Sequence, residues 1–170
     1  MPTRDAYIQE VTEFLSRPKT LAGIYLPIPW QPNRDPSELC IKVPIEVEGV
    51  VSERRLIVVF FPSAEGLRFT ILIKFVVAVC RLDFEENGGH TNGFLNLENL
   101  PMTIQGPHYH RWSSNTRFVQ GYAKLPELDN AEGLPTAIRS FDAALRWFCD
   151  EANIALPNTH QIQLPPRNLI

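Results

Sequence analysis

The segment "GPHYHRW", at positions 106–112, holds the residues with the clearest potential for chemistry. His108 and His110 are two positions apart, so on a β-strand both imidazoles project from one face, while Tyr109 and Arg111 project from the other. Histidine titrates near neutral pH and is a common metal ligand. This face can therefore serve acid–base chemistry, metal binding or simple packing, and the segment alone leaves the three alternatives open.

Polar residues that precede this pair extend the candidate site. An Arg-x-Asp pair comes after a long apolar stretch, and the segment "NGGHTNG" adds a third histidine and an asparagine. Several imidazoles with one carboxylate suit zinc, manganese or iron. The candidate catalytic residues are Arg81, Asp83, His90, Asn92, His108 and His110, and the last two are also candidate ligands of a divalent metal.

Cleavage of RNA without a metal is a second chemistry open to this set. A histidine pair with one neutral and one protonated ring can act as base and acid. Arg81, Arg111 or Arg117 would then hold the phosphate through a fork of N–H groups. Structural roles remain open as well, since exposed arginines often form surface ion pairs and Asp83 and Asn92 are of types that bond their own backbone in turns.

Composition restricts the classes of function. The 170 residues include 16 basic and 19 acidic ones, a net charge of -3, whereas a general nucleic-acid binder carries a basic footprint. Any contact with RNA must therefore be a local patch. Cys40, Cys80 and Cys149 lie in apolar stretches, which predicts buried free thiols and a cytoplasmic protein. The start lacks a signal-like pattern and no apolar run approaches roughly 18 residues, so secretion and membrane insertion are not expected.

The N-terminal third predicts one helix and one long connection. Apolar residues recur at spacings of three and four from Arg4 to about Arg17, and Pro18 ends this amphipathic helix. The proline-rich segment 25–36 predicts a connection without regular structure, lying over the body of the domain with Trp30 exposed.

Three apolar segments predict strands. Residues 41–48 alternate between apolar and polar, which predicts a half-buried strand, and Pro44 places it at a sheet edge because proline lacks an N–H. Segment 55–61 predicts a fully buried strand. Segment 67–84 is too long for one strand, so a break is expected near residues 74–76.

The alternation beyond this break bears on the candidate site. Continued past Val77 and Val79, it puts Arg81 and Asp83 on the same side as the valines. Both charges would then be buried unless the strand leaves the core at that point.

Elements of the C-terminal half complete the predicted fold. Segment 85–93 predicts a loop, and 106–112, the turn residues "SSN" and "TRFVQGY" together predict a hairpin. Apolar residues at helical spacing predict a helix from about Pro135 to Asn153, and the tail from 155 to 170 has little to bury. We therefore expect a single α+β domain over 1–154, with a mainly antiparallel sheet of about five or six strands packed by an N-terminal and a C-terminal helix.

The order "RLDF", "GGHTN", "GPHYHRW" and "IRSFDAALRWFCDEANI" resembles small uncharacterised proteins of prokaryotic prophages and mobile elements. The similarity covers roughly Leu67 to Ile154, with Gly93-Phe94 in place of a Pro-Asp-Gly turn. The chain is also similar, more loosely, to the TumE toxin family of toxin–antitoxin pairs, through the Arg-x-Asp strand and the later His-x-His. Carried over by position, both similarities rest on the six candidate residues named above.

Two functions from different classes are expected from these features. The first is a toxin or effector of a mobile element with a histidine-rich hydrolytic site and RNA as the expected substrate, with a divalent metal as a candidate cofactor and an antitoxin as partner. The second is a non-enzymatic binding protein, such as a phage-encoded inhibitor of a host defence complex or a partner of a helix-turn-helix protein. The acidic balance and the predicted edge strand with Glu46 and Glu48 favour the second, and the histidines favour the first.

Overall fold

The computed structural model describes residues 3–93, 99–116 and 125–165. Within these ranges the helices are α1 (Arg4–Ser16), α2 (Trp112–Asn115) and α3 (Phe141–Glu151), and the strands are β1 (Lys19–Leu21), β2 (Gln31–Pro32), β3 (Leu39–Val47), β4 (Val50–Phe60), β5 (Arg68–Lys74), β6 (Ala78–Glu85), β7 (Gly89–Thr91), β8 (Thr103–Gln105), β9 (His108–His110) and β10 (Glu132–Gly133). None of the helices there combines the length and apolar character that crossing a bilayer requires.

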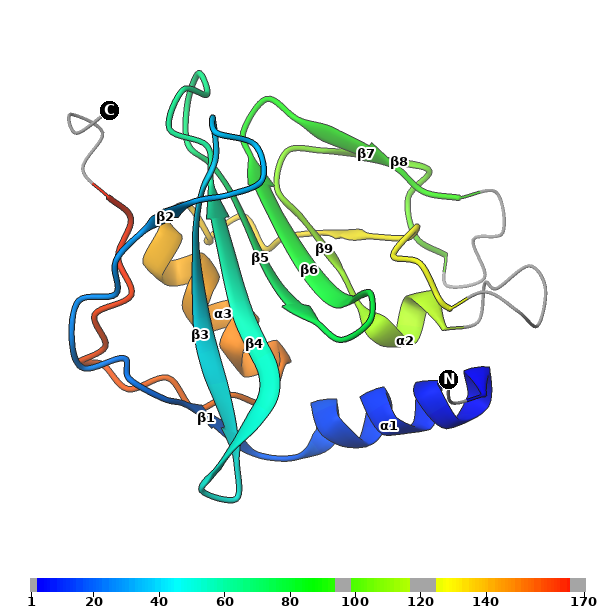
Figure 1. The fold of residues 1–170 in the computed structure, drawn as a ribbon. Helices are drawn as coiled ribbons and strands as arrows, with labels where there is room; N and C mark the ends of the chain where they lie inside the picture. Colours follow the sequence, from blue (N-terminus) through cyan, green and yellow to red (C-terminus); the bar gives the residue numbers. More distant parts are fainter. Residues whose placement is uncertain (1–2, 94–98, 117–124, 166–170) are drawn as a thin grey trace.

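A large antiparallel sheet dominates the fold (Figure 1). Its strand order is β1-β3-β4-β5-β6-β9-β10, with β2 also paired to β3, and a separate two-stranded sheet joins β7 to β8. The predicted α+β class with a mainly antiparallel sheet is confirmed. The eight strands of the large sheet exceed the five or six expected because β1, β2 and β10 are only two or three residues long.

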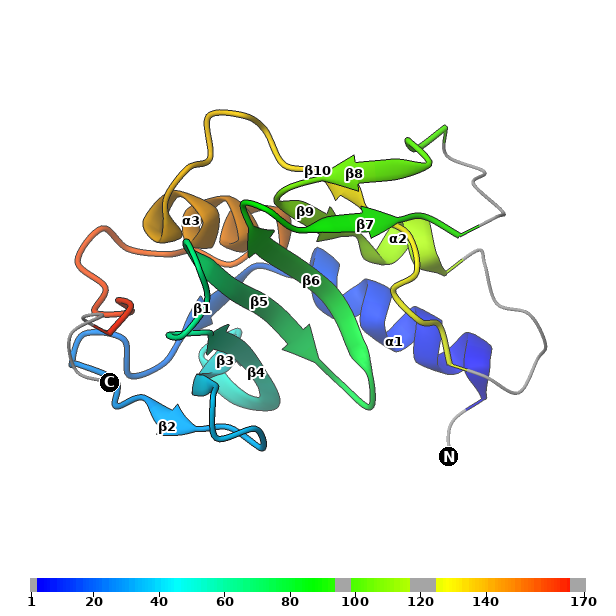
Figure 2. The ribbon, with the colours of Figure 1, turned by 90° about the horizontal axis from the view of Figure 1, so that it is seen from above.

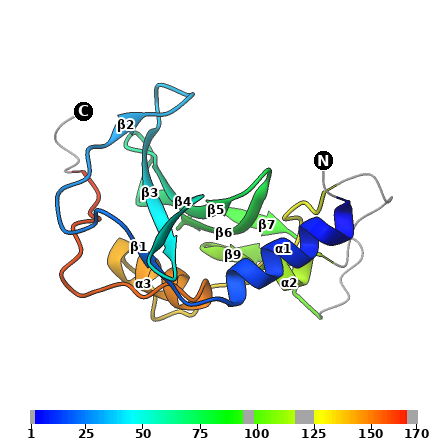
Figure 3. The ribbon, with the colours of Figure 1, turned by 60° about the horizontal axis from the view of Figure 1, so that its bottom comes forward.

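Helices α1 and α3 lie on the same side of the large sheet (Figure 3). From α1, Tyr7 and Val11 are buried, as the predicted N-terminal helix requires. From α3, Leu145 and Phe148 are buried in the same cluster as the apolar residues of β3 to β6. The hydrophobic core therefore fills one face of the sheet only, and the opposite face is left for other uses.

Helix α3 begins later than predicted. Its first residue is Phe141 rather than a position near Pro135, because the Ser140 side chain accepts a hydrogen bond from the backbone N–H of Ala143. A serine in this position satisfies an N–H group that the helix itself cannot, and so fixes the start. The apolar residue Ile138 continues the helical spacing but packs from the preceding segment.

Two predictions about β3 and β4 are wrong. β3 is not an edge strand, since β4 flanks one side and the short strands β1 and β2 flank the other. Pro44 is tolerated because it lies outside both short pairings and beside a register shift between Pro44 and Glu46. β4 is not fully buried: Leu56, Val58 and Phe60 face the core while the residues between them are partly exposed.

The break predicted in segment 67–84 is confirmed, and it changes which face Arg81 and Asp83 occupy. Ile73 pairs with Cys80 but Lys74 pairs with Ala78, so one extra residue lies in β6 at this point. Both Val79 and Cys80 are buried, and from Cys80 onward the alternation is reversed. Arg81 and Asp83 therefore lie on the face away from the core, and their predicted position on the valine side is wrong.

The proline-rich connection and the C-terminal tail hold each other in place. Trp30, expected to be exposed, is half-buried against Phe60, and its Nε1 donates to the carbonyl of Gln163 at 3.0 Å. The backbone N–H of Gln161 donates to the carbonyl of Ile24 at 2.6 Å. The connection also contains β2, and Ile162 is 1% exposed, so the tail up to residue 165 contributes to the core, contrary to prediction.

Candidate functional site

Strand register builds the site on the face of the sheet away from the core. Across β5, β6 and β9, Thr70 pairs with Asp83 and Asp83 pairs with His108. Two residues earlier in β6 and two residues later in β9, Arg81 pairs with His110. Residues directly opposite each other on neighbouring strands project from the same face. The two histidines of β9 are thus placed beside the Arg-x-Asp pair of β6 by backbone pairing alone.

The residues that alternate with the two histidines project from the opposite face, as predicted. Tyr109 packs edge-on against Trp147, with ring centroids 5.0 Å apart. Arg111 forms ion pairs with Glu132 and Glu151, so it is not free to hold a phosphate. The other proposed phosphate ligand, Arg117, lies outside the described residues.

The segment after His110 differs from the predicted hairpin. Trp112 begins helix α2, where its Nε1 donates to Thr12 Oγ1 at 3.1 Å, so it does not stand beside the histidines. The expected turn "SSN" belongs to the same helix, and the second arm, from 117 to 122, lies outside the described residues. Within the described chain, β9 pairs instead with β6 and β10.

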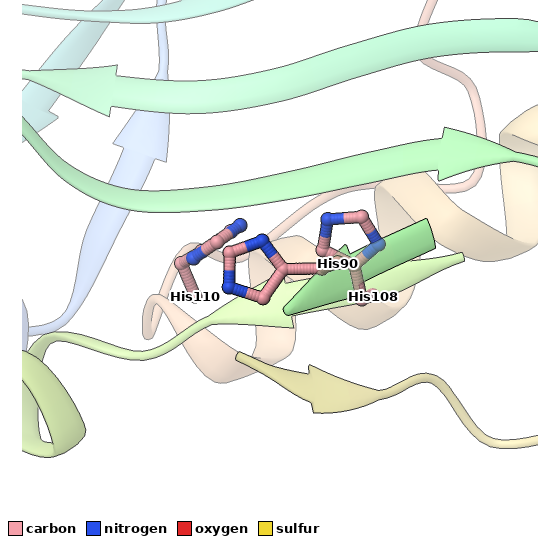
Figure 4. A group of neighbouring side chains, drawn as sticks. All are labelled: His90, His108 and His110. Atoms are coloured by element: carbon pink, nitrogen blue, oxygen red, sulfur yellow. The ribbon is translucent and has the colours of Figure 1, made fainter. Parts of the chain in front are cut away.

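The third histidine comes from the small sheet. His90 lies in β7, where a loop is expected from the glycines and asparagines, and β7 pairs with β8 in a hairpin next to β9 and β10 (Figure 2). This hairpin brings the ring of His90 to the rings of His108 and His110 (Figure 4). The ring centroids lie 5.2 Å and 4.7 Å from that of His90, respectively.

Each of the three imidazoles has one nitrogen bound to a backbone carbonyl. His108 Nδ1 lies 3.0 Å from the carbonyl oxygen of Gly106, and His110 Nδ1 lies 3.2 Å from that of Asn130. His90 Nε2 lies 2.9 Å from the carbonyl oxygen of Asp129. A carbonyl oxygen only accepts, so these nitrogens carry the hydrogen and the other nitrogen of each neutral ring keeps a lone pair. This is the arrangement that fixes metal-ligating histidines in many proteins.

Gly106 contributes through its backbone. Its φ of +79° lies in the left-handed region, which side chains other than glycine's disfavour. The resulting turn leads the chain into β9 and presents the Gly106 carbonyl oxygen to the His108 ring.

Arg81 and Asp83 complete the cluster. The Nε of Arg81 donates to Asp83 Oδ2 at 2.6 Å, and its Nη2 donates to His110 Nε2 at 2.9 Å. Thr70 Oγ1 donates to Asp83 Oδ1 at 2.7 Å. The same Oδ2 of Asp83 lies 3.6 Å from His108 Nε2 and 3.4 Å from His110 Nε2.

The charge states are set by these contacts. Burial lowers the pKa of His110 below its usual value, so its ring is neutral at neutral pH. Burial alone would raise the pKa of Asp83, but the charge of Arg81 and the hydrogen bond from Thr70 outweigh it and hold the pKa well below the usual range. Asp83 is therefore a carboxylate and His110 is a neutral base.

Exposure divides the cluster into an inner and an outer part. His110 has no exposed surface, whereas His90 and His108 reach a hollow of about 410 Å³. The hollow is lined by Phe61, Arg68, Phe69, Thr70, Arg81, Asp83, Phe84, Glu85, Gly89, His90 and His108. A substrate in the hollow can thus meet two histidines, two arginines and Asp83, but it cannot touch His110 directly.

The donor set fits a divalent metal ion. One ring nitrogen of each histidine lies within 4.8 Å of the others. Ligands at about 2.1 Å from a tetrahedral zinc ion are about 3.4 Å apart, close to the distances from Asp83 Oδ2 to the Nε2 atoms of His108 and His110. A His₃Asp site would require the ring of His90 to move closer to the ligand atoms of the other two histidines and Asp83.

Asn92 lies at the edge of the cluster and supports the backbone. Its Nδ2 donates to the carbonyls of Pro101 and Ala131, and its Oδ1 accepts from the N–H of Ala131 at 2.6 Å. These bonds use its side chain fully. Asn92 therefore positions the segment that supplies the Asn130 carbonyl, and the structure does not bring it together with the imidazoles as a reacting group.

Two residues of the site are missed by sequence reasoning. Asn115 Oδ1 accepts from the N–H of Asn130 at 2.7 Å, and its Nδ2 donates to the Asn130 carbonyl at 2.9 Å, the same carbonyl that His110 contacts. Thr70 is the second. Its place opposite Asp83 depends on strand register, which no local pattern reveals.

The cysteines take no part in the site. Cys40, Cys80 and Cys149 are buried and unpaired, as expected. Burial raises the pKa of the Cys80 and Cys149 thiols to about 12. Neither is a thiolate at neutral pH, so neither is a nucleophile.

Comparison with known proteins adds no relative. No family model matches the chain, and neither the curated proteins nor the solved structures compared with it give a match. The similarity to prophage proteins and to the TumE family stays a prediction.

Proposed function

We propose that the chain is a metal-dependent hydrolase of phosphodiester bonds, with RNA as its substrate class. The observation that carries this proposal is the convergence of three imidazoles, each with one nitrogen bound to a backbone carbonyl, beside the carboxylate of Asp83. Three imidazoles and one carboxylate form a strong donor set for zinc, manganese or iron.

The residues of the hollow supply what a phosphodiester needs. Arg81 and Arg68 line the hollow, and a phosphate would exchange with their present carboxylate partners, Asp83 and Glu85. The guanidinium of Arg68 lies over the Phe61 ring, with its Cζ 4.5 Å from the ring centroid, and so presents a flat cationic surface against which a base can stack. These contacts fit a short single-stranded segment and agree with a local rather than a general nucleic-acid patch.

The reaction adds water across one P–O bond. A bond forms between phosphorus and the water oxygen, the ester bond breaks, and one proton passes from the water to the leaving oxygen. His90, His108, His110 and Asp83 would hold the metal ion, which would act as a Lewis acid on a phosphoryl oxygen. In the alternative without a metal, His90 and His108 are the two histidines that reach the hollow and can move this proton.

The biological role that we attach to this activity is that of a toxin or effector of a prokaryotic mobile element, acting in the cytoplasm. It rests on the resemblance to prophage and TumE proteins, which also implies an antitoxin as partner. The buried free thiols of the chain support a reducing compartment.

RNA integrity after expression tests the activity. We expect the wild-type chain to degrade RNA and a variant with His108→Ala and His110→Ala to leave RNA intact. The matched control is His160→Gln, which removes the remaining histidine, outside the lining of the hollow, where it contacts Asp142 at 3.1 Å. Equal RNA decay with folded wild type and double variant would remove the catalytic proposal.

A chelator separates the metal-dependent from the metal-free chemistry. EDTA should abolish cleavage by the purified protein, and zinc or manganese should restore it. Cleavage that persists in EDTA, and that still requires His90 and His108, would assign acid–base catalysis without a metal instead.

Exposed apolar residues favour the second candidate, a binding protein that inhibits a host defence complex or accompanies a helix-turn-helix protein. Tyr25 and Leu26 are 65% and 74% exposed at the start of the proline-rich connection. Trp30 does not add to this surface, because it is held by the tail. A pull-down with purified candidate partners should lose binding on Tyr25→Ser with Leu26→Ser, and binding that survives this change would exclude this surface.

A further inference from the structure

We propose that Arg81 occupies the position of the metal ion when the site is metal-free, and that an oxyanion in the hollow draws its guanidinium out and so raises the affinity for metal. This inference rests on the metal site of the proposed function. It adds a regulatory step, in which substrate-like anions and the metal bind cooperatively.

The contacts of Arg81 coincide with those of the expected metal. Its Nε lies 2.6 Å from Asp83 Oδ2 and its Nη2 lies 2.9 Å from His110 Nε2. Both acceptor atoms belong to the proposed ligand set, and His110 Nε2 has a single lone pair. That lone pair can face the guanidinium or a metal ion but not both, so the two cations exclude each other.

The carboxylate of Asp83 requires a neighbouring cation in both the metal-free and the metal-bound site. Its carboxylate is about three-quarters buried, with 23% of the side chain exposed, and a buried charge without a partner is strongly unfavourable. Exchange of Arg81 for a metal ion keeps this charge compensated at every stage. If Arg81 left without a metal ion to replace it, the charge of the Asp83 carboxylate would not be compensated.

The Arg81 side chain can turn toward the hollow when its guanidinium leaves Asp83 and His110. Of its side chain, 34% is exposed, and it lines the hollow together with Arg68 and Thr70. A phosphate group there can accept the guanidinium fork that Asp83 and His110 release. Binding of the anion therefore stabilises the arrangement in which the ligand atoms are open to metal.

Thermodynamic linkage fixes the sign and symmetry of the effect. If the anion raises the affinity for metal by some factor, the metal raises the affinity for the anion by the same factor. Couplings between two sites commonly amount to between about 5-fold and 150-fold. We expect a coupling of about tenfold here, because the two sites share one side chain.

Isothermal titration calorimetry of the whole chain with zinc, in the presence and absence of sulfate, tests the coupling between anion binding and metal binding. Sulfate is the probe because it is a tetrahedral dianion that leaves zinc in solution, and chloride at equal ionic strength is its reference. We expect sulfate to tighten zinc binding by the wild type about tenfold. Arg81→Met should bind zinc at least tenfold more tightly than the wild type without sulfate, and sulfate should then have no effect.

Arg68→Met is the matched control, since Arg68 lines the same hollow and contacts Phe61 and Glu85 but no expected ligand of the metal. This variant should keep the zinc affinity of the wild type in the absence of sulfate. Arg81→Gln serves as a second variant if Arg81→Met does not fold, because its amide can still donate to Asp83 while it carries no charge.

The outcomes separate this inference from the proposed function. If the wild type binds no zinc, or if His108→Ala with His110→Ala binds it as tightly, the metal site itself fails. If zinc binds through the histidines but both Arg81 variants bind it more weakly, or sulfate leaves the wild type unchanged, the metal site stands and the exchange of cations is overturned.

Discussion

The ring of His90 meets the ring of His110 edge-on, with centroids 4.7 Å apart, although the two residues belong to different sheets. The site thus exists only where the β7–β8 hairpin docks on the large sheet. Ile104 of β8 is buried in this contact, and its Cγ2 occupies the space that a side chain at Gly133 in β10 would face. Any change that loosens the hairpin should therefore weaken the site without touching the other two histidines.

Metal content provides the first test. We expect about one zinc or manganese ion per wild-type chain, and His90→Ala should lower this to a small fraction, because two imidazoles and one carboxylate remain without the hairpin ligand. Elemental analysis of the purified proteins measures it, with His160→Gln as the control that keeps the metal. Full metal content in His90→Ala would show that the hairpin does not contribute a ligand.

Asp83→Asn should reduce RNA cleavage at least about 100-fold, since an amide oxygen is a far weaker ligand than a carboxylate and no longer balances the nearby cation. Glu85→Gln is a close control, because Glu85 lies on the same strand and lines the same hollow but faces Arg68. Initial rates on a labelled oligoribonucleotide measure both. A similar loss in the two variants would point to the general charge of the hollow instead of a specific role of Asp83.

Asn115→Ala should lower both stability and zinc affinity. It leaves the buried N–H of Asn130 without an acceptor, which costs about 1–3 kcal/mol in the free energy of unfolding. It also frees the carbonyl that fixes His110, and loss of such a support typically reduces metal affinity about 10- to 100-fold. Urea unfolding and zinc titration measure the two effects. Asn158→Ala, which removes an exposed contact with Arg146, should change neither.

The lowered pKa of the buried Lys19 side chain leads us to expect that the free energy of unfolding increases at alkaline pH. Its Nζ is buried and donates to the carbonyls of Phe14, Leu15 and Arg17 at the end of α1. Burial lowers its pKa from 10.5 to about 8. Between these values the unfolded chain holds a proton that the folded chain has lost, so the free energy of unfolding should increase with pH, by at most about 3 kcal/mol. Below about pH 8 both states are protonated and the contribution is constant.

Urea unfolding of the wild type and of Lys19→Met at about pH 7.5 and pH 10 checks this. Other ionisable groups are common to both proteins and cancel in the difference. The wild type should gain stability relative to the variant as pH rises. A constant difference across this range would contradict the lowered pKa.

Ile162→Ala should destabilise the protein by about 2–5 kcal/mol, as expected for truncation of a fully buried aliphatic side chain. Leu26→Ala, at a position that is 74% exposed, should change the free energy of unfolding by no more than about 0.5 kcal/mol. Chemical unfolding measures both. Equal, small changes in the free energy of unfolding of the two variants would show that the tail is loosely held, as its sequence predicts.

Local patterns in the sequence account for much of the fold. The spacing of Tyr7 and Val11 identifies α1, the alternation of residues 41–48 identifies β3, and the break after β5 is predicted from strand length alone. The i, i+2 spacing of His108 and His110 gives their common face. Each of these features depends on neighbours along the chain, which is why the sequence is sufficient to predict them.

The features that the sequence does not reveal depend on contacts between distant segments. The start of α3 is decided by the cap at Ser140, and β7 forms because β8 supplies its hydrogen bonds. Burial of His110 and the bond from Trp30 to the tail likewise require parts of the chain that are far apart in sequence. Spacing within a short window carries no information about such partners.

The extra residue where β6 begins has a consequence for sequence variation. Loss of the one extra residue would leave Lys74 opposite Ala78 and Ile73 opposite Cys80, so Arg81 and Asp83 would stay on the outer face and Leu82 in the core. In functional homologues, the turn between β5 and β6 should therefore tolerate the loss of one residue. The pairing of β5 with β6 beyond the bulge, more than the length of the turn, is then the property that natural selection has to preserve.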